Sequence, residues 1–346
     1  MRSIYLADVG DGFCMGIHTI LGSLIQVDCG GENKKVAFEG FTRTINFYNN
    51  VPDAFILSHF HVDHYNGLLY TSINPFRYPS FRIREVYYPR IPEFKRKNEF
   101  LLKLFTLNLA VFGSETGVME YDLLRTITKL NNGKPPIKKP LSKGELIKIN
   151  GSIFEVLWPP AEITEEKVLS VIGKALDDFD KAMEEDKELR RLYEHVEEEG
   201  IFRDYLSEEE SNLERINEHY KSEKLHKREL PKIVKKANKS LREAANHLSL
   251  AFFEDNRLLF LGDTEKFEIK RIIMDLMLKE RENFYVLVTS HHGTHWHKSL
   301  ENVKCIYSLS SNGKKLCPKF RSEYKEIACC SLATFINGDI IIPIFP

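Results

Sequence analysis

The chain has 346 residues, a length that fits about two average domains, or one large α/β domain that carries an insertion. Hydrophobic residues make up 42%, enough for a sizeable core, and the net charge of −1 excludes a globally basic nucleic-acid-binding surface. Because the chain has no signal-peptide core, no apolar stretch of the ~20 residues that span a membrane and no CxxC pair among its six cysteines, we expect a cytoplasmic protein that makes no membrane contact and has reduced, mostly buried cysteines.

Short β-rich runs fill the first third of the chain, and longer helix-like stretches separate some of them, a pattern typical of a layered α/β fold. These expected strands are Ser3 to Ala7, Ser23 to Asp28, Ala54 to Leu57 and Glu85 to Tyr88. A hairpin is expected from Glu145 to Trp158 around the turn Asn150-Gly151, and Pro159-Pro160 ends it.

The composition changes abruptly from about Lys174 to Lys239, where about half of the residues are charged and the periodicity is helical. The stretch from Lys174 to Tyr220 holds 7 basic and 17 acidic residues, whereas Lys221 to Arg242 holds 9 basic and 2 acidic residues. We therefore predict a helical insertion. The favoured interpretation is a solvated antiparallel hairpin whose arms neutralise each other, and the alternative is an arm that docks a partner or a substrate.

After the insertion, Leu248 to Phe253 and Arg257 to Leu261 predict an antiparallel hairpin. The next segment predicts an amphipathic helix with one apolar stripe, formed by Ile269, Ile272, Ile273, Leu276 and Met277. The remaining expected strands are Tyr285 to Thr289, Cys305 to Leu309 and Asp339 to Ile344.

The sharpest motif is Ser58-His59-Phe60-His61-Val62-Asp63-His64, which directly follows an expected strand. It places four potential metal ligands within six residues, and imidazole and carboxylate groups are costly to bury together unless a cation satisfies them. In a tight loop, His59 and His61 can point to one side while Asp63 and His64 point to another. The motif therefore predicts two neighbouring metal sites.

Three further polar motifs follow expected strands: Asp28 after Leu24 to Val27, Asp263 in Leu261-Gly262-Asp263, and the pair His291-His292. In this order after an intact HxHxDH motif, they resemble the metallo-β-lactamase-fold superfamily of binuclear metallohydrolases. The resemblance covers nearly the whole chain outside the insertion. It implies an α/β fold of the αββα four-layer sandwich type, with a core of residues 1–160 and 244–346 and an insertion at 161–243.

A closer resemblance is to the soluble hydrolase domains related to the DNA-uptake protein ComEC. Three segments carry it: Asp8-Val9-Gly10-Asp11-Gly12, Asn246-His247-Leu248-Ser249-Leu250 and His291-His292-Gly293-Thr294. His61 stands where those domains commonly have Asp, which favours a filled two-metal site here. Cys317 stands about where many of those domains carry His.

The resemblance implies a set of ligands for two divalent ions: His59, His61, Asp63, His64, His247, Asp263, His291 and His292. Asp263 would bridge the ions, one of the two adjacent histidines would suffice, and Asp28 would brace the loop. The role of His247 stays open, because an Asn-Ser pair fills this position in ComEC-like domains. Zn²⁺ is the expected ion for nitrogen and oxygen ligands, and Mn²⁺ is the main alternative.

Two adjacent ions hold a bridging water whose pKa falls to about 7, which yields a hydroxide nucleophile suited to phosphodiesters. The basic, aromatic stretch from Phe76 to Lys97 favours a phosphodiester or nucleic-acid substrate. His295 or His297, just after the last histidine motif, is the expected proton donor to the leaving oxygen. We therefore predict a phosphodiesterase or nuclease with Asp63, Asp263 and His295 as catalytic residues.

Two alternatives stay open at this point. A carbonyl hydrolase of the thioesterase or lactonase type would have the same metal core. A non-catalytic subunit would instead dock a protein partner through the charged helical insertion.

Overall fold

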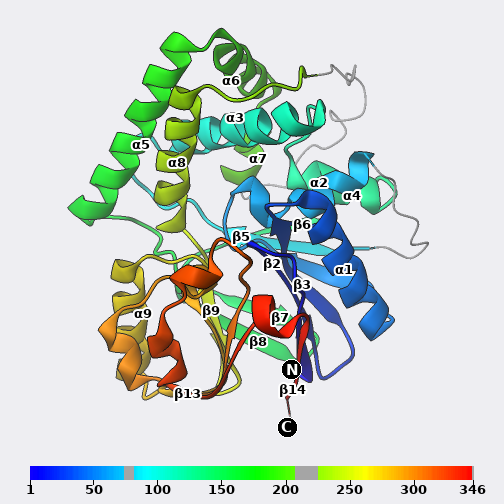
Figure 1. Cartoon of the computed structure of the whole chain (residues 1–346), viewed down its shortest axis with the longest axis vertical. Helices are drawn as coiled ribbons and strands as arrows, with labels where there is room; N and C mark the ends of the chain where they lie inside the picture. The colour runs from blue at the N-terminus through cyan, green and yellow to red at the C-terminus, as the bar shows by residue number, and fades with distance from the viewer. Residues whose placement is uncertain (74–81, 207–224, 345–346) are drawn as a thin grey trace.

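Two seven-stranded sheets face each other in the computed structural model, which describes residues 1–73, 82–206 and 225–344 (Figure 1). The first sheet has the order β14 (Ile340–Pro343), β1 (Ser3–Leu6), β2 (Gly12–His18), β3 (Leu24–Gly31), β4 (Pro52–Ile56), β5 (Glu85–Pro89), β6 (Ile137–Leu141). The second has the order β13 (Ala328–Ala333), β12 (Lys304–Ser310), β11 (Asn283–Val288), β10 (Leu258–Phe260), β9 (Ala251–Glu254), β8 (Ser152–Trp158), β7 (Leu146–Ile149).

Strand direction changes at the middle of each sheet. In the first sheet the pairs from β14 to β3 are antiparallel and the pairs from β3 to β6 are parallel. In the second sheet the pairs from β7 to β10 are antiparallel and those from β10 to β13 are parallel. In each sheet the carboxyl ends of neighbouring parallel strands therefore meet at one edge, the place where α/β proteins commonly build a site.

The core consists of three apolar clusters, one at each interface between layers. Along β1, Ile4 and Leu6 belong to the cluster between the sheets, whereas Tyr5 and Ala7, just past the strand, pack on the helical side. This alternation follows from the two-residue period of a strand that is covered on both faces. Three interfaces require four layers, so the predicted αββα sandwich is confirmed.

The outer layers are helical. Over the first sheet and above it lie α1 (Lys34–Tyr48), α2 (Asn66–Ile73), α3 (Lys97–Thr116), α4 (Leu123–Leu130), α5 (Glu166–Glu185), α6 (Lys187–Glu199), α7 (Phe202–Leu206) and α8 (Lys232–Asn246). Against the second sheet lies α9 (Lys266–Leu278), and α10 (Thr334–Asn337) follows β13. Short 3₁₀ turns are η1 (Val62–His64), η3 (Ser290–Gly293), η4 (Lys298–Asn302), η5 (Cys317–Lys319) and η6 (Ser322–Lys325). None of the helices in the described ranges is both long and apolar enough to cross a membrane.

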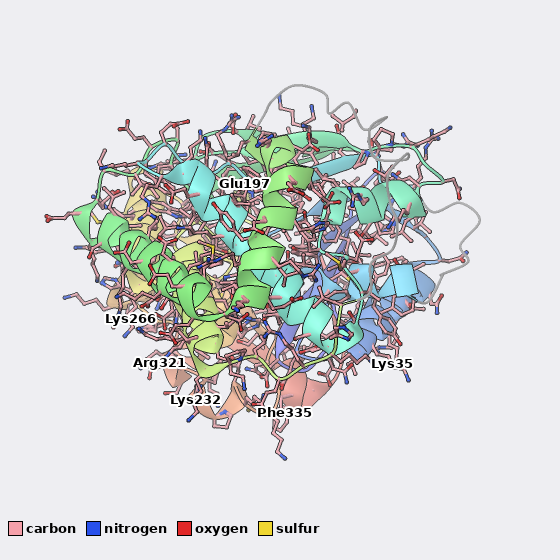
Figure 2. The ribbon with its side chains drawn as sticks, turned by 90° about the horizontal axis from the view of Figure 1, so that it is seen from above. Lys35, Glu197, Lys232, Lys266, Arg321 and Phe335 are labelled. Atoms are coloured by element: carbon pink, nitrogen blue, oxygen red, sulfur yellow. The ribbon has the colours of Figure 1, made fainter. Side chains whose placement is uncertain are left out.

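The insertion forms more helices than the predicted hairpin of two arms. Its described part contains α5, α6, α7 and α8, and α5 and α8 lie side by side above the sheets (Figures 1 and 2). Asp178 of α5 binds Lys236 Nζ at 2.8 Å and Ser240 Oγ at 2.7 Å on α8. A partly exposed ion pair contributes at most about 1 kcal/mol. The pairing of α5 with α8 is therefore stabilised mainly by buried apolar side chains, which include Phe179 on α5 and Leu241 on α8. This packing supports the intramolecular interpretation of the charge asymmetry.

Several expectations about local structure were wrong or incomplete. The strands β2, β6 and β13 were not predicted, because β2 is interrupted by Gly16, and β6 and β13 are edge strands in which few residues are buried. Met277 lies outside the buried stripe of α9 and is 39% exposed. Of the six cysteines, only Cys14, Cys29 and Cys305 are buried.

Candidate metal centre

The site lies at the rim where loops from both sheets meet. The loop after β4 carries the motif residues 58–64, and the turns after β10 and β11 carry Asp263 and residues 290–295. A backbone hydrogen bond from Leu250 N to Ser58 O, 2.7 Å long, ties the second sheet to the loop of the first. The predicted convergence of these distant segments is therefore present.

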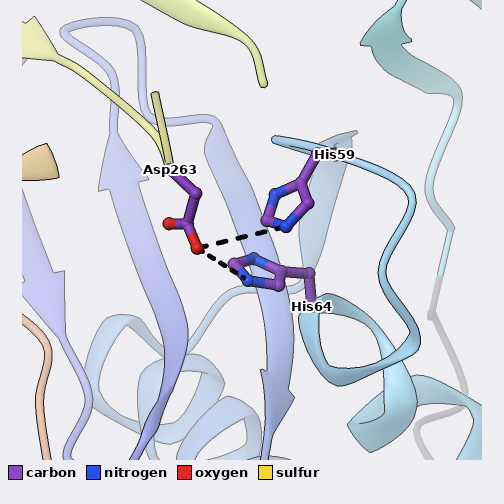
Figure 3. A group of neighbouring side chains, drawn as sticks. All are labelled: His59, His64 and Asp263. Carbon is purple, nitrogen blue, oxygen red and sulfur yellow. Dashed lines mark ion pairs between the residues drawn. The ribbon is translucent and has the colours of Figure 1, made fainter. Parts of the chain in front are cut away.

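One carboxylate oxygen lies at the centre of the site. Asp263 Oδ2 is 3.6 Å from His64 Nε2 and from His292 Nε2, 3.9 Å from His291 Nε2 and 4.0 Å from His59 Nε2. Figure 3 shows the carboxylate of Asp263 facing the rings of His59 and His64. These three residues also form a buried group whose ligand atoms all lie within 4.8 Å of one another. The spacing leaves room for an ion between the carboxylate and the imidazoles.

Two buried ligand atoms of the motif find no hydrogen-bond partner among the residues that the structure describes. They are His61 Nε2 and Asp63 Oδ1. Leaving a buried polar atom unsatisfied costs about 1–3 kcal/mol, whereas a metal ion would satisfy both atoms. The residues present therefore fit divalent ions. The other nitrogen of His61, Nδ1, lies 2.7 Å from His59 Nε2.

The loop is braced from beneath by Asp28, as the resemblance implied. Asp28 accepts hydrogen bonds from Ser58 N at 2.7 Å, from Ser58 Oγ at 2.5 Å and from His64 Nδ1 at 2.7 Å. These bonds fix the ring of His64 so that Nε2 faces Asp263. Such carboxylate partners commonly orient histidines that bind metal.

Asp63 points toward the insertion as well as the site. Its Oδ2 accepts a 2.7 Å hydrogen bond from Arg242 Nη2 on α8, and its Oδ1 is one of the unpartnered buried atoms. One oxygen is therefore held by a guanidinium, and the other is available to an ion. From the sequence, Arg242 was noted only as the last residue of the basic stretch Lys221 to Arg242. Its place beside Asp63 depends on how α8 packs against the rest of the protein, chiefly against α5.

The two adjacent histidines differ in orientation. His292 Nδ1 donates a 2.8 Å hydrogen bond to the carbonyl oxygen of Ser311, which turns its Nε2 toward Asp263. His291 Nδ1 instead lies 2.8 Å from His295 Nε2, outside this centre. Both histidines have positive φ values, 46° for His291 and 60° for His292, an uncommon backbone conformation that often occurs at functional sites. By orientation, His292 is the better candidate for the central site.

The third-motif residues take other positions. His247 ends α8, and its Nδ1 lies 2.7 Å from Glu268 Oε1, whereas its carbonyl oxygen accepts a hydrogen bond from Trp158. Among the described residues, none of its hydrogen bonds or ion pairs is with the central histidines or with Asp263. Ser249 Oγ accepts a 2.9 Å hydrogen bond from Asp263 N and so positions the central carboxylate. This arrangement favours the alternative in which the Asn-Ser pair shapes the pocket.

Burial and the neighbouring charges set the protonation state of each group in the site. Burial lowers the pKa of His59 and the pKa of His61 well below the usual value, so both imidazoles are neutral near pH 7. Burial acts the same way on His64, but the carboxylates of Asp28 and Asp263 outweigh it and raise the pKa of His64 to about 10. His64 therefore carries a proton near pH 7 that a bound ion would have to displace. Burial opposes ionisation of Asp263, yet the surrounding imidazoles hold its pKa well below the usual value. The central carboxylate is therefore ionised at neutral pH.

Sequence reasoning missed three residues of the site. Asn108 of α3 donates to Phe60 O at 2.7 Å and accepts from Val62 N at 3.3 Å, and so supports the metal loop. Arg242 and Glu265 reach the site from α8 and from the residue before α9. No local motif marks any of them, because their roles depend on contacts between segments far apart in the chain.

Much of the basic stretch after the metal loop is engaged within the protein. Residues 76–81 lie outside the described ranges. Arg96 pairs with Asp177 and Asp180 of α5 at 3.2 and 3.1 Å, Arg90 pairs with Glu145, and Lys97 pairs with Glu93. This stretch therefore gives little support for a nucleic-acid groove.

Comparisons with known proteins give structural likenesses only. No family model and no curated protein sequence matches the chain. Solved structures with partial similarity include MEM-A1, a subclass B3 metallo-β-lactamase from a soil metagenome library (13% identity, 45% of this chain and 48% of that chain, TM-score 0.27). Others are BLEG-1, a B3 metallo-β-lactamase (16% identity, 44% and 59%, TM-score 0.24), and a β-lactamase domain protein from Burkholderia ambifaria (15% identity, 42% and 41%, TM-score 0.25). The chain thus spans about half the length of these proteins.

Proposed function

We propose that this protein is a binuclear metal-dependent hydrolase that acts on phosphodiesters, nucleic acid among them. The observation that carries the metal-dependent part is the convergence of four imidazoles on one oxygen of Asp263, beside two unpartnered buried ligand atoms. His59, His61, Asp63, His64, Asp263 and His292 would hold the ions. When bound, two divalent ions would supply Lewis acidity and lower the pKa of an attacking water to about 7.

The preference for an anionic substrate rests on Arg242. Its side chain is 41% exposed, and within the described ranges Asp63 is its only hydrogen-bond partner. A guanidinium has five N–H donors, so donors remain for the oxygens of a phosphodiester at the mouth of the site. A neutral lactone or thioester carries no charge for this group to neutralise. The arginine therefore favours phosphodiester over carbonyl hydrolysis.

A substrate panel tests the proposed reaction. Purified protein is assayed with bis-p-nitrophenyl phosphate, single- and double-stranded DNA, RNA, a lactone and a thioester, with and without added Zn²⁺ or Mn²⁺. We expect metal-dependent cleavage of at least one phosphodiester. Cleavage of carbonyl substrates alone would replace this proposal with the thioesterase or lactonase alternative, and no cleavage at all would favour a non-catalytic, partner-docking subunit.

Replacing Arg242 should weaken the recognition of anionic substrates. Because a charge-assisted hydrogen bond contributes about 1.5–3 kcal/mol, Arg242→Gln should raise KM for bis-p-nitrophenyl phosphate about 10- to 150-fold, and Arg242→Lys should raise it less. Lys239→Gln, a change of an exposed lysine on the same helix, is the matched control and should leave KM unchanged. An equal loss on a neutral ester would mean that Arg242 acts only by positioning Asp63.

A further inference from the structure

A second group of potential ligands lies beside the proposed centre, and none of its members is among the six residues proposed to hold the two ions. Glu265 comes from the residue before α9, His291 from η3, and His295 from the loop that follows η3. Their ligand atoms all lie within 4.8 Å of one another. The side chains are 26%, 26% and 19% exposed for Glu265, His291 and His295, so solvent and ions can reach them.

The distances within this outer cluster match those around a tetrahedral ion. His295 Nδ1 lies 3.2 Å from His291 Nδ1 and 3.4 Å from Glu265 Oε2. Bonds of about 2.0–2.1 Å from a zinc ion to nitrogen and oxygen imply ligand-to-ligand distances of about 3.3 Å at tetrahedral angles. The carbonyl oxygen of Thr264 lies a further 3.2 Å from His295 Nδ1. The three side chains therefore need little movement to enclose one ion.

Neighbouring groups hold each member of the outer cluster in place. Asn246 Nδ2 donates to Glu265 Oε1 at 3.3 Å and leaves Oε2 facing His295. His291 N donates to Gly262 O at 2.9 Å. The buried Tyr324 donates its hydroxyl hydrogen to His295 O at 2.7 Å. Such supporting contacts are typical of ligands that must keep a fixed geometry.

We propose that Glu265, His291 and His295 bind a third divalent ion, separate from the two ions of the proposed centre. Two imidazoles and one carboxylate favour a borderline ion such as Zn²⁺ over Mg²⁺ or Ca²⁺. Three protein ligands leave a fourth position open to water or to a substrate oxygen. His291 links the two sites, because its Nε2 lies 3.9 Å from Asp263 Oδ2. We expect weaker binding here than at the centre, because the ligands are more exposed.

This assignment replaces the predicted role of His295 as proton donor whenever the ion is bound. An imidazole nitrogen whose lone pair is shared with a metal ion carries no proton to give. If His295 binds the third ion, a His295 variant should hold one ion fewer than the native protein. If His295 is only a proton donor, the ion content of the variant should be unchanged. This comparison does not depend on any activity.

Zinc titration of the full chain tests the proposal. The native protein and the variants Glu265→Gln, His295→Gln and His297→Gln are dialysed against buffers of rising free Zn²⁺, and ions per chain are measured by elemental analysis. We expect the native protein and His297→Gln to bind one ion more than Glu265→Gln and His295→Gln. The control removes a neighbouring histidine whose Nδ1 bonds Ser299 instead of the cluster.

Equal ion content in all four proteins at saturation would overturn the third site. If the proposed centre is wrong, the ion content of all four proteins should fall together, while the difference of one ion would persist. Titration with Co²⁺ gives a second readout, because the visible absorption of the last ion to bind should be absent in His295→Gln. Retention of that band in this variant would also contradict the assignment.

Discussion

Asp263→Asn is expected to abolish hydrolysis and to remove most of the bound metal while leaving the fold intact. The substitution keeps the shape of the side chain but removes the charge that faces four imidazoles at 3.6–4.0 Å. Losing a residue that only orients a ligand costs about 10- to 100-fold in affinity or activity, so losing the central ligand should cost more than about 100-fold in kcat/KM. The backbone of residue 263 would keep its hydrogen bond to Ser249.

Elemental analysis and thermal unfolding check this result together. The native protein, after growth in metal-replete medium, should carry at least about two ions per chain, and Asp263→Asn at most about one. Asp63→Ala should lose activity in the same way, because it removes the unpartnered oxygen beside His61. Full turnover by either variant would refute the role of that carboxylate, and fewer than one ion per chain in the native protein would remove the binuclear mechanism.

Gly30→Ala is expected to disturb the metal loop from the neighbouring strand. A Cβ atom at Gly30 would lie 2.0 Å from Asp63 O, 2.4 Å from Asp63 C and 2.5 Å from His64 C. These are backbone atoms that cannot turn aside, so the loop must move. We expect a loss of about 1–3 kcal/mol in the free energy of unfolding, typical of overpacking, and about 10- to 100-fold weaker metal binding.

Denaturant unfolding and metal titration measure the two effects separately. The matched control is Gly173→Ala on α5, where an added Cβ meets no atom within 4 Å. This control should keep the metal affinity and gain about 0.5–1 kcal/mol, because alanine stabilises a helix relative to glycine. Native metal affinity in Gly30→Ala would show that the loop does not depend on this close approach.

Most of the strands, and the strand-end positions of the polar motifs, could be predicted from the sequence. Alternation, turn residues and the six-residue spacing of the HxHxDH motif are local properties, and local patterns are readable without tertiary contacts. The strand β2 was missed because Gly12 and Gly16 interrupt its apolar pattern. The edge strands β6 and β13 were missed because exposure weakens the apolar signal.

The choice between adjacent residues could not be made from the sequence. His291 and His292 are neighbours with the same chemistry, and only their partners in the fold distinguish them. His292 Nδ1 bonds the carbonyl oxygen of Ser311, whereas His291 Nδ1 lies beside His295. Likewise, His247 is a plausible ligand by its place in the motif, yet in the fold its Nδ1 lies 2.7 Å from Glu268 Oε1 of α9.

By itself, the sequence determined the kinds of donor groups, their order along the chain and their positions at the ends of strands. Only the tertiary structure decided which donors meet, because Arg242, Glu265 and Asn108 reach the site from elements that are distant in the chain. Their positions depend on how helices pack on the two sheets, and that packing is fixed by buried contacts spread over the whole core rather than by any local pattern.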